Sequence, residues 1–405
     1  MKITLAFLTH EPFYPPSGGG SAEAVYLVEE FIRRGYEVHL FCPAFQDSSV
    51  VAARFGITVH PFTRWEMGRY TGRRNLKYLL YPTALAAHVR QTLCALQRVR
   101  GPEWKFDLLF AQHTISAVAA GRLRTQLRVP VVLNFLDYLT GFMETWPSVF
   151  TRTGLVPALN RFEMSLPRRY DVEGVLTVSQ PLADRFVATG YPQVRVLAIQ
   201  YGYDQALFTP ATVVAETPLI VVMHGSFDQH HLGQIARIAI GVVARQRPDV
   251  TFRFIGRETE GLKRFAADVR ASVANAQIEL TGFVPYTEIA GKLREASVGL
   301  VPYEESQGTH CAFVAKAVEY LGCGLPVVST PLENLQTYFR NEPAIKFSEF
   351  NGESFGGKIL EWLQVSAGER RRLGGLASAR VAVALDWKVV AQRAADFLEE
   401  KIRRV

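Results

Sequence analysis

The fold is decided by residues 313–330, whose sequence is FVAKAVEYLGCGLPVVST. This pattern predicts a short helix that ends at Gly322 and Gly324, because glycine favours helix C-termini and Pro326 prevents the helix from resuming. Residues 327–330 then have the apolar, β-branched character of a buried strand in a parallel sheet. A helix that leads directly into such a strand indicates an open α/β sheet.

The predicted helix carries two polar residues that suit a nucleotide site. Lys316 and Glu319 are three residues apart, so they share one helix face. The two carboxylate oxygens of a glutamate can accept hydrogen bonds from both hydroxyls of a ribose. Just upstream, residues 306–309 form a predicted loop into the helix, and free N–H groups at a helix N-terminus bind diphosphates readily. A ribose site beside a diphosphate site predicts a nucleotide-sugar pocket.

Length and composition limit the class of protein. The chain has 405 residues, enough for two or three domains, and is 48% hydrophobic and 20% charged, as in globular proteins. Its net charge of +7 suits anionic partners such as nucleotide sugars, membrane surfaces or nucleic acid. A nucleic-acid role is disfavoured, because the basic residues are dispersed and no recognised binding motif occurs.

Cysteine usage and hydropathy indicate a cytoplasmic protein. The four cysteines lack metal-ligand spacing and are expected to stay reduced. The apolar run at 3–8 is too short for a signal-peptide core, and no run approaches the ~20 apolar residues of a membrane span. Basic and aromatic residues alternate over 64–81. This stretch could contact the inner face of a membrane peripherally, line an acceptor pocket or form a solvated helix face.

The N-terminal part reads as a Rossmann-like unit. A strand at 3–8, a glycine loop at 18–20, a helix at about 21–34 and a strand at 37–41 follow in order. NAD binding is disfavoured, because Glu23 stands where the third glycine of a dinucleotide fingerprint belongs and no acidic residue ends the second strand. A second unit of the same kind starts with a strand at 219–223, so we place the domain boundary near residue 210.

One carboxylate follows a strand of the first unit. The strand at 130–135 leads to Asp137, and the ends of strands are where an open α/β sheet places its chemistry. Asp137 is therefore the predicted cleft carboxylate. His113 follows the strand at 107–111, and we interpret it as a structural histidine.

The motif K-x-x-E-Y-x-x-x-G-x-P-V-V, from Lys316 to Val328, resembles the donor-site motif of the GT-B glycosyltransferases, especially the large retaining family 4 group. The sequence Y-G-Y-D at 201–204, followed by F-T-P at 208–210, is similar to the signature that closes the N-terminal domain in this superfamily. The resemblance implies an α/β fold of two Rossmann-like domains with parallel sheets facing across a cleft. The implied parts are an acceptor domain (1–210), a nucleotide-sugar donor domain (211–385) and a helix that crosses back to the first domain (386–405).

The resemblance also implies the site residues. The glycine loop would face the donor phosphates, the loops after the strands of the second domain would contact the diphosphate, and the base would pack near the turn at 281–284. The implied donor-binding residues are Gly18, Gly19, Gly20, His224, Gly225, Ser226, Arg257, Gly282, Phe283, Thr309, His310, Lys316 and Glu319. Asp137 is similar to the aspartate that serves as general base in other GT-B enzymes, so Asp137 and Glu319 are the candidate catalytic residues.

The chain departs from the family pattern at three places. Leu136 stands where many family 4 enzymes have a histidine, and Cys311 stands where many have an acidic residue. The segment 226–231 lacks the usual Arg or Lys for the diphosphate, so the cation is expected from a histidine, Arg257 or Lys316. The first departure, beside Asp137, leaves retention or inversion open. The three departures together favour one alternative, a non-catalytic GT-B scaffold that binds a nucleotide or a partner. A sugar-nucleotide epimerase of the same fold is the second alternative.

The implied activity is that of a hexosyltransferase without a metal or another cofactor. It would move a sugar from a UDP- or GDP-sugar to a hydroxyl of a glycan, a lipid-linked acceptor or a small molecule. Helix N-terminal amides and a cation would stabilise the leaving diphosphate.

Overall fold

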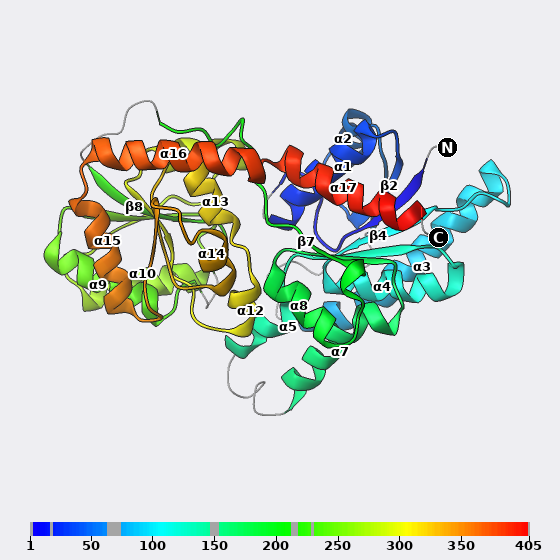
Figure 1. Cartoon of the computed structure of the whole chain (residues 1–405), viewed down its shortest axis with the longest axis horizontal. Coiled ribbons are helices and arrows are strands. Elements are labelled where there is room, and N and C mark those ends of the chain that lie inside the picture. The colour runs from blue at the N-terminus through cyan, green and yellow to red at the C-terminus, as the bar shows by residue number, and fades with distance from the viewer. Residues whose placement is uncertain are drawn as a thin grey trace. The chain divides into compact units, whose positions relative to one another are not determined.

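The computed structural model divides into two compact α/β units (Figure 1). The first comprises Met1–Thr140, Leu155–Gln200 and Ala391–Val405, and the second comprises Gly141–Gly154 and Tyr201–Val390. The structure describes residues 3–16, 19–62, 74–145, 154–211, 218–227 and 231–403, without the side chains of 74–79 and 145.

The described residues of the first unit form a seven-stranded parallel sheet with strand order β3-β2-β1-β4-β5-β6-β7. Its strands are β1 (Thr4–Leu8), β2 (Glu37–Pro43), β3 (Thr58–Phe62), β4 (Leu108–Gln112), β5 (Val131–Phe135), β6 (Gly174–Thr177) and β7 (Val196–Ala198). The order reverses between β1 and β4, and ligands of open α/β sheets bind at the carboxyl ends of strands beside such a reversal.

Helices surround this sheet, and α3, α4, α7 and α8 pack against one another in sequence. The helical segments are α1 (Gly19–Arg33), α2 (Ser48–Phe55), α3 (Arg74–Arg100), α4 (His113–Leu127), α5 (Leu139–Phe142), α7 (Leu155–Arg169), α8 (Gln180–Ala188), η2 (Gln193–Arg195) and α17 (Trp387–Arg403). The short helix η1 (Met143–Thr145), which follows α5, belongs to the second unit. The last turns of α17 belong to the first unit, where Arg34 forms ion pairs with Asp396 (2.7 Å) and Glu399 (2.9 Å).

The described residues of the second unit form a six-stranded parallel sheet with the order β10-β9-β8-β11-β12-β13. Its strands are β8 (Leu219–His224), β9 (Val250–Ile255), β10 (Gln277–Leu280), β11 (Val298–Val301), β12 (Val327–Ser329) and β13 (Ile345–Phe347). The helices are α9 (Gln234–Gln246), α10 (Glu260–Ser272), α11 (Tyr286–Arg294), α12 (Gln307–Cys311), α13 (Ala315–Gly322), α14 (Glu333–Tyr338), α15 (Gly352–Gln364) and α16 (Ala367–Leu385). The order reverses here between β8 and β11.

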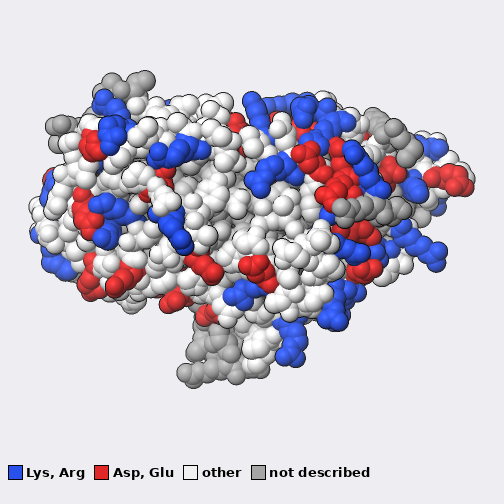
Figure 2. Space-filling view, viewed as in Figure 1, with Lys and Arg blue, Asp and Glu red and all other residues white. Residues whose placement is uncertain are grey.

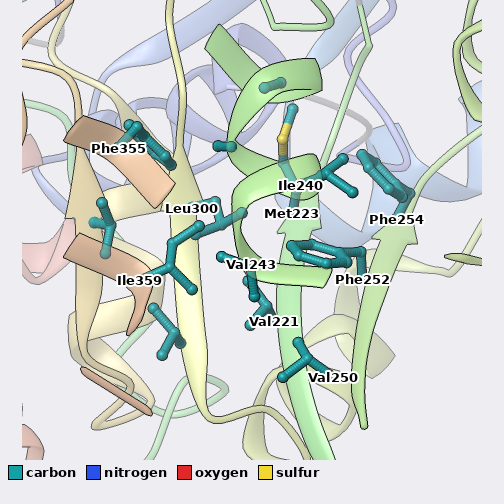
Figure 3. Close-up of a cluster of buried hydrophobic side chains, with 14 of the residues drawn as sticks. Val221, Met223, Ile240, Val243, Val250, Phe252, Phe254, Leu300, Phe355 and Ile359 are labelled. Carbon is teal, nitrogen blue, oxygen red and sulfur yellow. The ribbon is translucent and has the colours of Figure 1, made fainter. Parts of the chain in front are cut away.

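An apolar core fixes the central strands of the second unit (Figure 3). Side chains of β8 and β9 meet those of α9 and α15, among them Met223, Phe254, Ile240 and Phe355. The two helices approach closely because Gly356 has no side chain: a Cβ there would lie 2.8 Å from Cβ of Val242. This packing holds the carboxyl end of β8 in place.

The predicted fold class is confirmed, since both units are parallel-sheet, Rossmann-like domains. One local prediction was wrong. Residues 306–309 are not a loop leading into the helix of Glu319, because Ser306 caps the separate short helix α12. The helix that carries Glu319 is α13, which begins only at Ala315.

The surface shows no single basic face in the view of Figure 2, where Lys and Arg are intermixed with Asp and Glu. Within the described residues, no helix is both long enough and apolar enough to cross a bilayer. The stretch 64–81, for which we predicted peripheral membrane contact, lies outside the described residues except for the first turns of α3, so that prediction remains untested.

Candidate active site

The centre of the candidate donor site is a buried pair of side chains at the end of β8. Glu319 lies on α13, and its Oε2 is 2.6 Å from Nε2 of His224, the last residue of β8. Both residues are buried. The end of α13 helps to position Glu319. The helix ends at Gly322, and the chain then reverses at the left-handed Gly324 (φ 68°), where the amide of Leu325 donates to the carbonyl of Tyr320.

Lys316 lies one helical turn before Glu319, above the turn that follows β8. Its Nζ donates to the hydroxyl of Tyr303 at 3.1 Å and lies 3.3 Å from Nε2 of His231. Gly225 forms the turn with φ 105°, and a Cβ there would lie 3.0 Å from Cε of Lys316. Only glycine fits such a position well, both for its backbone conformation and for its space.

Three helix N-termini lie in this part of the second unit, and two are already capped. Glu304 accepts a hydrogen bond from the amide of Ile235 (2.9 Å) in the first turn of α9. In α12, Ser306 and Thr309 form a capping box, and the amide of Gln307 donates to Glu144 (2.9 Å). Among the described residues, no side chain caps α13. The N-terminus of α13, beside Lys316, is therefore the one suited to an anion.

The loops after β8, β9 and β10 pack backbone against backbone. The amide of Gly256 donates to the carbonyl of Gly282 (3.1 Å), and a Cβ on Gly256 would lie 2.2 Å from the carbonyl oxygen of Gly225. At this edge Phe283 is 55% exposed, and the Arg257 guanidinium lies 5.2 Å from its ring centroid. An exposed aromatic ring with a guanidinium over it is a surface on which a nucleobase can stack.

The predicted residues on α12 are engaged in local structure. The hydroxyl of Thr309 accepts a hydrogen bond from the amide of Ser306 (2.9 Å), and the side chain is fully buried. Nδ1 of His310 accepts a hydrogen bond from the amide of Glu333 (3.3 Å). Cys311, where an acidic residue was expected from the family pattern, is a buried free thiol. Donor contacts by Thr309 and His310 remain predictions.

In the first unit Gly20, in the first turn of α1, lies against residues that follow β1 and β4. A Cβ on Gly20 would lie 2.5 Å from Nε2 of His113 and 2.6 Å from Oε2 of Glu11, so the absence of a side chain lets both groups approach. Gly19 begins α1, whereas Gly18 lies outside the described residues. Asp137 is exposed just after β5.

The structure thus groups the predicted residues in two sets. One set lies in the second unit, at the end of β8: His224, Gly225, Lys316 and Glu319. The turn that contains Ser226 packs through Gly225 against Gly256. Gly256 in turn contacts the edge formed by Arg257, Gly282 and Phe283. In the first unit, Gly19, Gly20 and Asp137 lie at the carboxyl ends of the central strands. Within the described residues, no group of three or more His, Cys, Asp or Glu is arranged to hold a metal ion.

Sequence reasoning missed several polar groups of the first unit. His10 and His113 have their ring centroids 4.9 Å apart at the ends of β1 and β4. We interpreted His113 as structural, yet its backbone has φ 68°, a conformation that non-glycine residues rarely adopt outside constrained sites. Glu23, on α1, is buried. The strand-end rule that selected Asp137 could also have selected His10 and Glu11, whereas nothing in the sequence marks Glu23 as buried.

The arrangement of the chain is that of the GT-B class: two Rossmann-like units, the second with His224, Lys316 and Glu319 grouped at the carboxyl ends of its strands. Residues 18–202 match the family model described as "Glycosyl transferase 4-like domain", and residues 218–364 match "Glycosyl transferases group 1". The chain belongs to this glycosyltransferase family, which confirms the resemblance seen in the sequence. No curated protein matches the chain.

Solved structures of low sequence identity share the fold. Sucrose-phosphate synthase from Thermosynechococcus elongatus superposes with a TM-score of 0.80 at 14% identity, covering 100% of both chains. HepE from Anabaena, in complex with UDP-glucose, has a TM-score of 0.71 at 16% identity, covering 98% of this chain and 100% of HepE. WaaG, a glycosyltransferase of lipopolysaccharide biosynthesis, has a TM-score of 0.66 at 13% identity, covering 97% and 98%.

Proposed function

We propose that this glycosyltransferase moves a hexose from a nucleoside diphosphate sugar to an acceptor hydroxyl, and that the second unit holds the nucleotide. The observation that carries the proposal is the arrangement around α13: a buried carboxylate, a lysine and an uncapped helix N-terminus within two turns. UDP-glucose is the first donor to test, because the similar structure of HepE was determined with it.

Glu319 is the proposed ribose ligand. Its Oε2 is bonded to His224, and no hydrogen bond from another described residue reaches Oε1. We therefore expect Oε1 to be the main acceptor of hydrogen bonds from the ribose hydroxyls, while His224 fixes the direction of the carboxylate. This refines the sequence-based expectation that both oxygens serve the diol.

The diphosphate is proposed to lie between Lys316, the turn at Gly225 and the first amides of α13. Lys316 thereby supplies the cation that the family usually takes from the loop after the first strand of this domain. Donors and dipoles of this kind stabilise the charge that develops on a leaving diphosphate. We propose that no divalent ion takes part, so that EDTA leaves the activity intact and a strict Mg²⁺ or Mn²⁺ requirement would contradict this account.

In the first unit, Asp137 is the proposed general base for the acceptor hydroxyl, which belongs to a glycan, a lipid-linked sugar or a small molecule. Its exposure at the end of β5 makes the carboxylate available to a substrate. Replacing Asp137 with Asn should lower kcat by ~100-fold or more, as loss of a general base commonly does. The affinity for UDP should stay the same, because the nucleotide site lies in the other unit.

The decisive experiment is thermal stabilisation by UDP, GDP, ADP and NAD in the presence of EDTA. A ligand that binds only the folded state stabilises it by about 2.7 kcal/mol at a concentration of 100 Kd. Stabilisation by one diphosphate nucleotide supports the site, and release of UDP or GDP from its glucose conjugate then supports transfer. No stabilisation would favour a non-catalytic scaffold that binds a partner instead of a nucleotide, and conversion of the donor sugar without nucleotide release would favour an epimerase.

A further inference from the structure

Two buried carboxyl groups flank the segment that carries Asp137, and the proposed chemistry uses neither of them. Glu23, on α1, is 9% exposed, and Glu163, on α7, is 1% exposed. A buried carboxyl group is costly unless hydrogen bonds satisfy it, so each calls for an explanation.

Glu23 binds the segment on its N-terminal side. Its Oε2 accepts hydrogen bonds from Nδ2 of Asn134 (2.8 Å), at the end of β5, and from Nε2 of Gln112 (2.9 Å), at the end of β4. The same Gln112 nitrogen donates to the carbonyl of Gly20 (2.9 Å), and Oε1 of Gln112 accepts from the hydroxyl of Thr9 (2.9 Å). The Glu23 carboxyl group therefore contacts the ends of β4 and β5 directly, and Gln112 extends the network to Gly20 and to Thr9 after β1.

Glu163 binds the segment on its C-terminal side. Its Oε2 accepts from the amide (2.8 Å) and the hydroxyl (2.5 Å) of Thr140, and its Oε1 accepts from the amide of Leu139 (3.2 Å) and the hydroxyl of Thr114 (2.5 Å). These bonds satisfy the first amides of α5. Asp137 lies between the two anchored points, three residues after Asn134 and two before Leu139.

We propose that Glu23 and Glu163 are positioning residues that hold the segment of Asp137 from both ends and so aim this carboxylate at the acceptor. The inference rests on the proposed role of Asp137. A clamp of this kind suits catalysis because misplacement of a reacting group by about 1 Å can cost ~100-fold in rate. Asp137 itself is exposed, so close packing does not fix its position.

The charge state of Glu23 fits a holding role. Burial, together with the nearby Asp137 carboxylate, raises its pKa to about 7, although the hydrogen bonds from Gln112 and Asn134 act in the opposite direction. Glu11, His10 and His113 are the other titratable groups at these strand ends. A carboxyl group that is about half protonated near pH 7 can be replaced by neutral glutamine, whose amide oxygen can still accept both hydrogen bonds.

A kinetic double-mutant cycle tests the inference, with UDP release from UDP-glucose into water as the rate and UDP affinity and Tm as controls. We expect Asp137→Ala to lower the rate by ~100-fold or more, as loss of a general base does. Glu23→Ala should lower the rate by ~10-fold, because it misplaces Asp137 without removing it. The double variant should fall no more than ~2-fold below Asp137→Ala, since Glu23 acts through Asp137. Glu23→Gln should stay within ~3-fold of the parent rate.

Matched variants separate positioning from folding. Glu29 is exposed on the same helix α1, so Glu29→Ala should leave the rate unchanged. If Glu23→Ala fails to fold, Asn134→Leu removes the other partner of the same hydrogen bond and should show the same non-additivity with Asp137→Ala. Independent, multiplicative losses, or a parent rate in Glu23→Ala, would overturn the clamp. Absence of UDP binding by the parent protein would instead overturn the proposed function, on which the clamp rests.

Discussion

The role of Glu319 can be tested by removing either side of one contact. We expect 2′-deoxy-UDP or 3′-deoxy-UDP to bind more weakly than UDP, because a ribose hydroxyl then no longer donates to the Glu319 carboxylate. A hydrogen bond to a charged group contributes about 1.5–3 kcal/mol, or about 10–150-fold in Kd. One bond of this strength is expected rather than two, since Oε2 already accepts from His224 at 2.6 Å.

The assay is isothermal titration calorimetry with UDP and both deoxy analogues, or with GDP and its analogues if the nucleotide panel selects guanine. In Glu319→Ala the affinities for UDP and the deoxy analogues should converge, because the partner of the hydroxyl is gone. Glu319→Gln should show a penalty of about 0.5–1.5 kcal/mol, as for a neutral hydrogen bond. Glu260→Ala, on the exposed face of α10, serves as the control and should preserve the full penalty.

The reasoning would be refuted if the deoxy analogues bound the parent protein as tightly as UDP does. It would also fail if their penalty persisted undiminished in Glu319→Ala, because another group would then hold the ribose. The Tm of Glu319→Ala must be measured as a control for folding, because this variant leaves buried His224 without its carboxylate partner.

Three further predictions follow from the geometry. Gly225→Ala should lower the unfolding free energy by about 1–3 kcal/mol, because alanine is strained at this positive φ, and it should also weaken UDP binding. Gly357→Ala is the control: this glycine lies in a helix with open space around it, so the substitution should have neither effect. Lys316→Met should weaken UDP binding ~10–100-fold by calorimetry but leave uridine binding unchanged, because the lysine contacts phosphate. Burial lowers the pKa of His60, which lies beside His39, to about 4. The unfolding free energy should therefore be full above about pH 6.5 and fall by up to about 3 kcal/mol toward pH 4, because the unfolded chain binds the proton more tightly. Chemical denaturation at several pH values should show a smaller loss for His60→Gln.

Much of the donor site could be predicted from the sequence because its determinants are local. Lys316 and Glu319 share a helix face by spacing alone, and Gly324 and Pro326 mark where that helix ends. The place of α12 could not be predicted in this way. Ser306 and Thr309 read equally well as a loop, and the capping box that makes them a helix depends on side-chain directions that composition does not reveal.

His224 shows a second limit of sequence reasoning. Its position after a run of apolar residues predicts a strand end, but its contact with Glu319 spans 95 residues of sequence. That contact exists because β8 and β11 are adjacent where the strand order reverses, and α13 follows β11. Strand order is a tertiary property, so the partner of a strand-end residue stays hidden until the sheet is assembled.

The same argument explains why Glu23 was read only as a missing glycine. On an isolated helix, a glutamate three residues after the glycine loop has no reason to be buried. The adjacency of β1, β4 and β5 brings Gln112 and Asn134 to it from positions 89 and 111 residues away. Burial then follows from packing, and the raised pKa follows from burial. Glu23 breaks the glycine fingerprint of dinucleotide-binding proteins, yet it has a structural role in this fold. A glycine at this position would leave the side-chain amides of Gln112 and Asn134 without their acceptor.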